Sequence, residues 1–366
     1  MVVRELRSRP FLAGNPCRPC RACIGPLPAR PRGIRHGQPS HTGTRLTCRS
    51  TPAHERAAGE QLEEPWEVWW CYDGWHPAAD RLERLLPPWA LLKRMDPSRP
   101  LADQVSRARV LIPTTGLVTA ADIYAAADLR LVAQPAAGYN NIDVEAARAR
   151  GVPVTIAPGY NSRSVAEVSL MMMLMLSRKV DEARAVFAGR RPIGEPVGRE
   201  LAGKTLGIVG MGQVGRCLAE AARGLGMQVL GVTSRSPRSD LEHLLAASHI
   251  VSLHCPLTPA TRGLIGEREL GLMRPDAILI NAARGSVVQR DALAAALTAG
   301  RLAGVGLDTH WLEPAPVDDP LYADPRVLAL PHLGSISAEV YDRFAAVLAE
   351  NIVRVREGRE LLHRLC

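Results

Sequence analysis

The feature that most constrains the fold of this 366-residue chain is a group of glycines between an apolar segment and a helical pattern. The apolar segment 205–209 reads as a strand, and Gly210-x-Gly212-x-x-Gly215 follows it directly. One face of the next segment repeats apolar residues at helical spacing: Val214, Leu218, Ala222 and Leu225. Such glycines allow a tight turn and let backbone approach a pyrophosphate at a helix N-terminus. We predict a dinucleotide site at Gly210, Gly212, Gln213, Val214 and Gly215.

The residues after the next predicted strand, 228–232, bear on which dinucleotide binds. Sites for NAD place an Asp or Glu about 20 residues past the glycines, where it holds the adenine ribose. Thr233 fills that position here. Ser234 and Ser236 can donate hydrogen bonds, and Arg235 can supply charge and stack on adenine. We expect NADP to be preferred, with NAD possible. Alternatively, Arg235 and Arg238 are solvated loop charges.

Strand and helix patterns alternate from Trp66 onward, which predicts an α/β fold of two doubly wound lobes with parallel sheets. The expected strands are 67–72, 108–112, 129–134, 152–156, 205–209, 228–232, 250–254, 277–281 and 302–307. The expected helices include 120–126, 144–150, 164–176, 291–298 and 338–356. We expect a Rossmann cofactor domain (166–335) inserted into a flavodoxin-like substrate domain (66–165 and 336–366).

The net charge of +8 comes from the first 60 residues, which hold eleven Arg, no Lys and three acidic residues. The remaining residues have 34 basic and 34 acidic side chains, so nucleic-acid binding is not expected. The Arg-rich, acid-poor leader is typical of a transit peptide, and we expect a chloroplast location, with mitochondrion or cytoplasm as alternatives. A disordered tail or a misplaced start codon would also fit. We expect the mature chain to begin between 49 and 65.

The cysteines and the apolar runs indicate neither a metal site nor a membrane span. Cys17, Cys20 and Cys23 have metal-ligand spacing, but Arg and Pro fill the gaps and no metal is expected. The apolar run 168–176 is too short to span a bilayer, so no membrane association is expected.

Three polar residues follow predicted strands in the second lobe. Arg284, Glu313 and His332 each come after an apolar segment, at the edge where open α/β sheets bind ligands. Each could be a surface residue on its own; together they indicate a catalytic site.

From about residue 67 onward the sequence resembles the D-isomer-specific 2-hydroxyacid dehydrogenase family. The matching stretches are 137–143 (AGYNNID), 161–167 (NSRSVAE), the glycine turn, 254–258 (HCPLT), 281–285 (NAARG), 306–308 (GLD), 313–314 (EP) and 331–334 (PHLG). Where the family has an aliphatic and then an aromatic residue after Asp308, this chain has Thr309 and His310. That departure affects the expected shape of the pocket.

The resemblance implies an enzyme that forms a homodimer and interconverts a small 2-oxo acid and its D-2-hydroxy acid. It makes Arg284, Glu313 and His332 catalytic, and it places the amides of Ala137 and Gly138, with Arg284 and His332, at the substrate. It extends the expected cofactor contacts to Cys255, Pro256, Thr261, Ala282, Ala283, Asp308 and Gly334.

The residue types fit that chemistry. A hydride reaching a ketone carbon leaves negative charge on oxygen, so an acid must supply a proton. Of the three side chains, His332 is the one that ordinarily titrates near neutral pH. Glu313 would favour its protonated form, and Arg284 offers a planar fork for a carboxylate.

Two other functions stay open. A 3-phosphoglycerate dehydrogenase would need a phosphate site and often carries a further C-terminal domain. Because the chain ends at Cys366, soon after the last predicted helix, we expect the glyoxylate or hydroxypyruvate reductase type instead. A dinucleotide-sensing corepressor could retain the same three residues. The sequence does not specify which 2-hydroxy acid is used or the physiological direction.

Overall fold

The computed structural model describes residues 64–190, 194–316 and 318–366. The predicted leader, with Cys17, Cys20 and Cys23, lies outside these described residues.

The first sheet is parallel throughout and has the strand order β2-β1-β3-β4-β5. Its strands are β1 (Trp66–Trp70), β2 (Ala90–Arg94), β3 (Ala108–Ile112), β4 (Leu131–Ala133) and β5 (Val154–Thr155). Relative to chain order this is 2-1-3-4-5, the flavodoxin-like arrangement predicted for the substrate domain.

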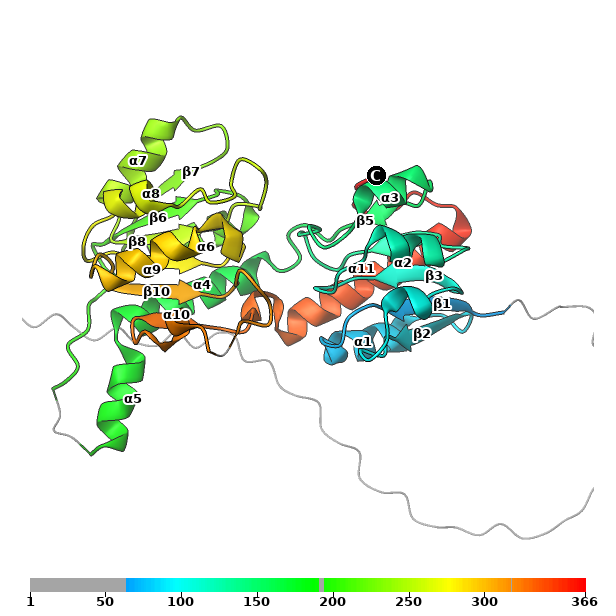
Figure 1. The fold of residues 1–366 in the computed structure, drawn as a ribbon, viewed down its shortest axis with the longest axis horizontal. Coiled ribbons are helices and arrows are strands. Elements are labelled where there is room, and N and C mark those ends of the chain that lie inside the picture. Colours follow the sequence, from blue (N-terminus) through cyan, green and yellow to red (C-terminus); the bar gives the residue numbers. More distant parts are fainter. Residues whose placement is uncertain (1–63, 191–193, 317) are drawn as a thin grey trace, which may run out of the picture. The chain divides into compact units, whose positions relative to one another are not determined.

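Helices cover both faces of the first sheet. One core joins the strands to α1 (His76–Leu85) and α11 (Ala338–Glu357), and the other joins them to α2 (Ala120–Ala125), α3 (Val144–Ala149) and the short η1 (Leu101–Asp103). Phe344 and Val340 of α11 are fully buried in the first core. Figure 1 shows α11, coloured orange to red, beside α1, although the two segments are far apart in the sequence.

The second sheet has the order β11-β10-β9-β8-β6-β7, again parallel throughout. Its strands are β6 (Thr205–Val209), β7 (Gln228–Val232), β8 (Ile250–Leu253), β9 (Ile278–Asn281), β10 (Gly304–Leu307) and β11 (Val327–Ala329). The direction of winding reverses between β6 and β8, and ligands bind at such a switch point in open α/β sheets.

Two cores sandwich the second sheet. One contains α7 (Arg238–Ala247), α8 (Glu267–Leu272) and α9 (Arg290–Thr298), and the other contains α4 (Ser162–Ser177) and α6 (Gln213–Gly224). The remaining elements are α5 (Val180–Ala188), α10 (Pro320–Ala323), η2 (Gly285–Val287) and η3 (Leu333–Ser335). The predicted fold class, two doubly wound α/β lobes, is therefore confirmed. The domain boundaries stay predictions, and α4 runs across the first of them.

The structure also corrects the sequence analysis. The edge strand β2 was not predicted, because it ends in Lys93 and Arg94, and β11, the three-residue strand before His332, was expected without bounds. Helical segments were expected between the strands, but α1, α5, α7, α8 and α10 were given no bounds. Leu225, expected on the buried face of the helix after the glycines, is instead the C-cap of α6 and 41% exposed.

Candidate active site

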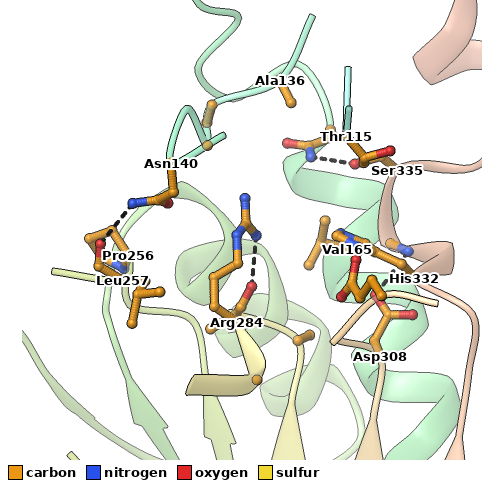
Figure 2. Close-up of a pocket in the computed structure, with 18 of the residues that line it drawn as sticks. Thr115, Ala136, Asn140, Val165, Pro256, Leu257, Arg284, Asp308, His332 and Ser335 are labelled. Atoms are coloured by element: carbon orange, nitrogen blue, oxygen red, sulfur yellow. Dashed lines mark hydrogen bonds and ion pairs between the residues drawn. The ribbon is translucent and has the colours of Figure 1, made fainter. Parts of the chain in front are cut away.

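A cavity of about 540 Å³ lies where segments from both sheets meet. Predicted site residues that line it are Ala137, Gly138, Val214, Cys255, Pro256, Ala282, Ala283, Arg284, Asp308, Glu313, His332 and Gly334. Figure 2 shows Arg284 in the middle of this space, with Asn140 and Leu257 on one side and His332 on the other. The side chain of Asn140 donates a hydrogen bond to the Leu257 carbonyl, which links the segment after β4 to the segment after β8 (3.2 Å).

His332 and Glu313 form a hydrogen-bonded pair. His332 Nδ1 and Glu313 Oε2 are 2.8 Å apart, which leaves the other ring nitrogen, Nε2, to exchange a proton with a ligand. His332 has the left-handed φ of 56°, so the turn after β11 presents its ring through a conformation that few L residues adopt. Pairing through Nδ1 is the arrangement in which a carboxylate orients a catalytic imidazole.

The local environment keeps Glu313 ionised. Burial alone would raise its pKa, but the hydrogen bond and charge of His332 and the backbone amide of His310 hold that pKa below its ordinary value. The His310 amide donates to Oε1 at 3.0 Å, so each carboxylate oxygen has its own partner. Glu313 can therefore stabilise a positive charge on His332 without itself taking the proton.

Arg284 reaches from the end of β9 toward the loop after β4. Its Nη1 donates to the carbonyl of Ala283 at 2.8 Å, and its Nη2 lies where a side chain on Gly138 would begin. Figure 2 shows the guanidinium pointing at the loop that carries Ala136. Burial lowers the pKa of Arg284, and the charge of Glu313 opposes that shift. An arginine stays charged at neutral pH under such a shift, so the cavity holds a desolvated cation beside backbone.

The loop after β4 is shaped by the side-chain amides of Gln134, which is buried, and Asn141, which is partly buried; neither was singled out from the sequence. Gln134 Nε2 donates to the carbonyls of Thr114 (2.9 Å) and Gly138 (2.7 Å). Asn141 Nδ2 donates to the carbonyls of Gly116 (2.6 Å) and Thr114 (3.2 Å). An uncharged polar residue at the end of an apolar strand is the signal that could have identified Gln134. These bonds fix the backbone that faces Arg284.

The glycine turn fits a dinucleotide. Gly210 has φ 106°, and a Cβ there would lie 2.6 Å from the amide nitrogen of Cys255, so β6 and the end of β8 meet closely at the switch point. A Cβ on Gly212 would meet nothing within 4 Å, which leaves open space beside the N-terminus of α6 for a pyrophosphate. Gly215 packs against the carbonyl of Gly210. These residues could hold the cofactor.

Other predicted cofactor contacts lie outside the cavity lining. Gln213 is near Ser162, whose hydroxyl is 3.4 Å from Gln213 Oε1. Thr261 Oγ1 donates to the Pro256 carbonyl (2.6 Å) and so shapes the turn that follows Pro256. The predicted ribose-phosphate group, Thr233, Ser234, Arg235 and Ser236, follows β7 on the surface.

Asp308 and Cys255 also have shifted pKa values, which limit their roles. Burial raises the pKa of Asp308, although the charge of His332 and the amides of Leu333 (2.7 Å) and Gly334 (3.0 Å) act to lower it. Both carboxylate oxygens of Asp308 thus hold the turn that carries His332. Burial raises the pKa of the Cys255 thiol to about 11, so it is not a thiolate at neutral pH.

Further lining residues were missed or left open by the sequence. His254 and the two indoles of Trp75 and Trp311 line the cavity without having been predicted there. His310, which marks the departure from the family pattern, lines it as well. Among the described residues no group of three or more potential ligands could hold a metal ion, and no described helix is long and apolar enough to cross a membrane.

Comparison with known proteins shows what the chain is related to. A family model for the NAD-binding domain of D-isomer-specific 2-hydroxyacid dehydrogenases matches residues 170–334. The chain is 42% identical over 250 residues to a glyoxylate reductase of Korarchaeum cryptofilum, covering 64% of this chain and 75% of that protein. It is 34% identical over 312 residues to a D-3-phosphoglycerate dehydrogenase of Mycobacterium tuberculosis, covering 82% of this chain and 54% of that one.

Solved structures agree. A protein of Thermus thermophilus is 37% identical with a TM-score of 0.74, covering 82% of this chain and all of that chain. A glyoxylate reductase of Paecilomyes thermophila is 28% identical with a TM-score of 0.69, covering 82% of this chain and 98% of the other. This chain belongs to the D-isomer-specific 2-hydroxyacid dehydrogenase family and is an oxidoreductase that uses a nicotinamide dinucleotide.

Proposed function

We propose that this enzyme reduces a small 2-oxo acid of the glyoxylate or hydroxypyruvate type to the corresponding 2-hydroxy acid, with NADPH as its preferred cofactor. The observation that carries this proposal is the placement of the His332–Glu313 pair and the Arg284 guanidinium in one cavity beside the loop at Gly138. The pair supplies a proton donor, and the guanidinium supplies a fixed positive charge.

The proposed roles follow from these positions. Arg284 and the amides of Ala137 and Gly138 bind the substrate carboxylate, which orients the ketone. A reduced nicotinamide, when bound, would supply the hydride that the ketone carbon accepts. His332 donates its Nε2 proton to the ketone oxygen as negative charge develops there, and Glu313 stabilises the imidazolium beforehand. In the reverse direction His332 accepts the hydroxyl proton.

The charge of the cavity favours a substrate without a phosphate group. Arg284 is the only Arg or Lys among the described residues that line it. The substrate carboxylate is its natural partner, so a 3-phosphate would find no second arginine or lysine. Relatives named D-3-phosphoglycerate dehydrogenase make that substrate the alternative to test.

A panel of 2-oxo acids, each assayed with NADPH and NADH, tests the proposal. We expect turnover of glyoxylate and hydroxypyruvate with NADPH and at least ~10-fold lower kcat/KM for 3-phosphohydroxypyruvate, as for one unpaired charge. The reverse substrate order would overturn the assignment. Failure on every acid with tight dinucleotide binding retained would instead favour a dinucleotide-sensing protein.

Two features support the NADP preference. The position for an acidic residue is Thr233, whose Oγ1 accepts from the amide of Arg235 (3.2 Å) and whose own amide donates to Ser236 Oγ (3.1 Å). Within the described part of the chain, the exposed Arg235 side chain has no hydrogen-bond or ion-pair partner. Arg238, by contrast, pairs with Glu269. Arg235 is thus the arginine available to a 2′-phosphate.

We also propose a homodimer and a chloroplast location. No residue of α5 is buried, and Phe187 in it is 86% exposed, so this helix offers apolar surface to a second copy. Light scattering should then give about twice the mass of one chain, and a monomer at micromolar concentration would contradict it.

The Arg-rich composition of residues 1–60 supports the chloroplast location. Fusing them to a fluorescent protein tests it, with mitochondrial or cytoplasmic signal as the contrary result.

A further inference from the structure

His310 stands in the short segment between β10 and Glu313, at the position where the sequence departs from the family pattern. Its ring makes two hydrogen bonds. Nδ1 is 3.0 Å from the Tyr322 hydroxyl, and Nε2 is 2.9 Å from the Leu330 carbonyl oxygen. Because a carbonyl can only accept, the proton of the ring lies on Nε2, and Nδ1 accepts from Tyr322. The ring also packs edge-on against Tyr322, with centroids 5.2 Å apart.

The carbonyl that His310 contacts also holds the backbone of His332. The amide of His332 donates to the same Leu330 oxygen at 3.0 Å. This bond closes the turn in which His332 takes its left-handed conformation. The ring of His310 therefore helps to fix the Leu330 carbonyl, and the backbone conformation of His332 depends on its hydrogen bond to that carbonyl.

The backbone of His310 holds the other member of the pair. Its amide donates to Glu313 Oε1 at 3.0 Å, while Glu313 Oε2 receives His332 Nδ1 at 2.8 Å. His310 thus makes hydrogen bonds both to the Glu313 carboxylate and to the Leu330 carbonyl that holds the backbone of His332. The indole of the neighbouring Trp311 donates to the Val288 carbonyl at 2.7 Å, so both His310 and Trp311 are held by hydrogen bonds.

We propose that His310 is a positioning residue that holds His332 and Glu313 in register for proton transfer, acting through the Leu330 carbonyl and the Glu313 carboxylate. This inference rests on the proposed roles of His332 and Glu313. A phenylalanine at this position would fill similar space but could not donate to Leu330, whereas a glutamine offers an N–H at a similar reach. Small displacements of reacting groups are costly, because proton transfer depends steeply on alignment.

The test compares His310→Phe with His310→Gln in the full chain, using glyoxylate and NADPH. We expect His310→Phe to lower kcat about 10-fold, with the KM for glyoxylate and the Kd for NADPH within about twofold of wild type. We expect His310→Gln to recover kcat to within about threefold. A residue that only stabilised the fold would change the melting temperature without this split between kcat and KM.

A double-mutant comparison separates positioning from an independent effect. If His310 acts through the pair, His310→Phe should lower kcat much less in a Glu313→Gln background than in wild type. An equal loss in both backgrounds, or wild-type kcat in folded His310→Phe, would overturn the proposal. If His310→Phe does not fold, Tyr322→Phe, which frees Nδ1, takes its place and should lower kcat about threefold; unchanged kcat would then count against the proposal.

The result is distinguishable from a failure of the proposed function. If His332→Ala abolishes turnover while His310→Phe is normal, the proposed catalytic pair stands and the positioning role is wrong. If His332→Ala is itself active, the proposed mechanism is wrong.

Discussion

The wall of the cavity that comes from the first sheet and the wall that comes from the second present different chemical groups to the same space. The first contributes mainly backbone, the loop at Ala137 and Gly138, held by the side-chain amides of Gln134 and Asn141. The second contributes charged and titratable side chains from three successive strand ends, Arg284, Glu313 and His332. In our account the first wall fixes where a carboxylate sits, and the second carries the chemistry.

Apart from removal of His332, removal of the Arg284 guanidinium should reduce activity most. Arg284→Ala should lower kcat/KM for glyoxylate at least ~10²-fold, because both carboxylate binding and the positive field are lost. Arg284→Lys keeps the charge without the planar fork, and we expect an intermediate loss. Steady-state kinetics with saturating NADPH measure both. Activity near wild type in Arg284→Ala would remove this residue from the mechanism.

A change on the backbone wall should act through the same arginine. A Cβ at position 138 would overlap Arg284 Nη2, so Gly138→Ala must displace the guanidinium. We expect about a 10-fold loss of kcat/KM, smaller than for deletion of the side chain because the arginine can move aside. Gly224→Ala is a matched control, since a Cβ there meets nothing within 4 Å. Equal kinetics for the two variants would show that the backbone wall is not critical.

The cofactor preference can be tested without touching either wall. Arg235→Ala should raise the KM for NADPH about 10-fold, as for one lost charged hydrogen bond, and leave the KM for NADH almost unchanged. Arg238→Ala is the control on the same surface, because Arg238 already pairs with Glu269. Equal effects of Arg235→Ala on both cofactors, or a native preference for NADH, would contradict the NADP assignment.

The smallest expected effect concerns stability in acid. Burial lowers the pKa of His254 from 6.5 to about 4, and its Nδ1 has no partner among the described residues. Below pH 6.5 the unfolded chain binds a proton that the folded chain does not take up until about pH 4, so stability falls across that window. At pH 5 this difference in proton binding lowers the free energy of unfolding by about 2 kcal/mol relative to pH 7. Urea unfolding at pH 7 and at pH 5 measures this. Between the two pH values, His254→Asn should lose less free energy of unfolding than wild type.

The exposed His243 provides the matched control for that measurement. His243→Asn should lose stability between pH 7 and pH 5 as wild type does. If His254→Asn does the same, His254 is not the source of the acid sensitivity.

How much the sequence could predict differs between the two walls. The glycine turn and the three strand-end residues were predicted because each depends on local order: a strand, then a particular residue type. The parallel sheets place such ends at one edge, and the structure brings Arg284, Glu313 and His332 into one cavity. Their catalytic roles stay predictions.

The backbone wall, and the side chains that hold backbone in place by hydrogen bonds, were harder to predict from the sequence. Gln134 acts through carbonyls of residues 114 and 138, and His310 acts through a carbonyl of residue 330. Contacts between a side chain and distant backbone leave no periodic or spacing signal. The edge strand β2 was missed for a related reason, since pairing on one side requires little apolar patterning.

The most direct test of the account is the rate of glyoxylate reduction by His332→Ala, measured together with its Kd for NADPH. If His332 donates the proton from the second wall, kcat should fall at least ~10²-fold, whereas NADPH should bind within about twofold of wild type. A His332→Ala enzyme that reduces glyoxylate at close to the wild-type rate would contradict the account.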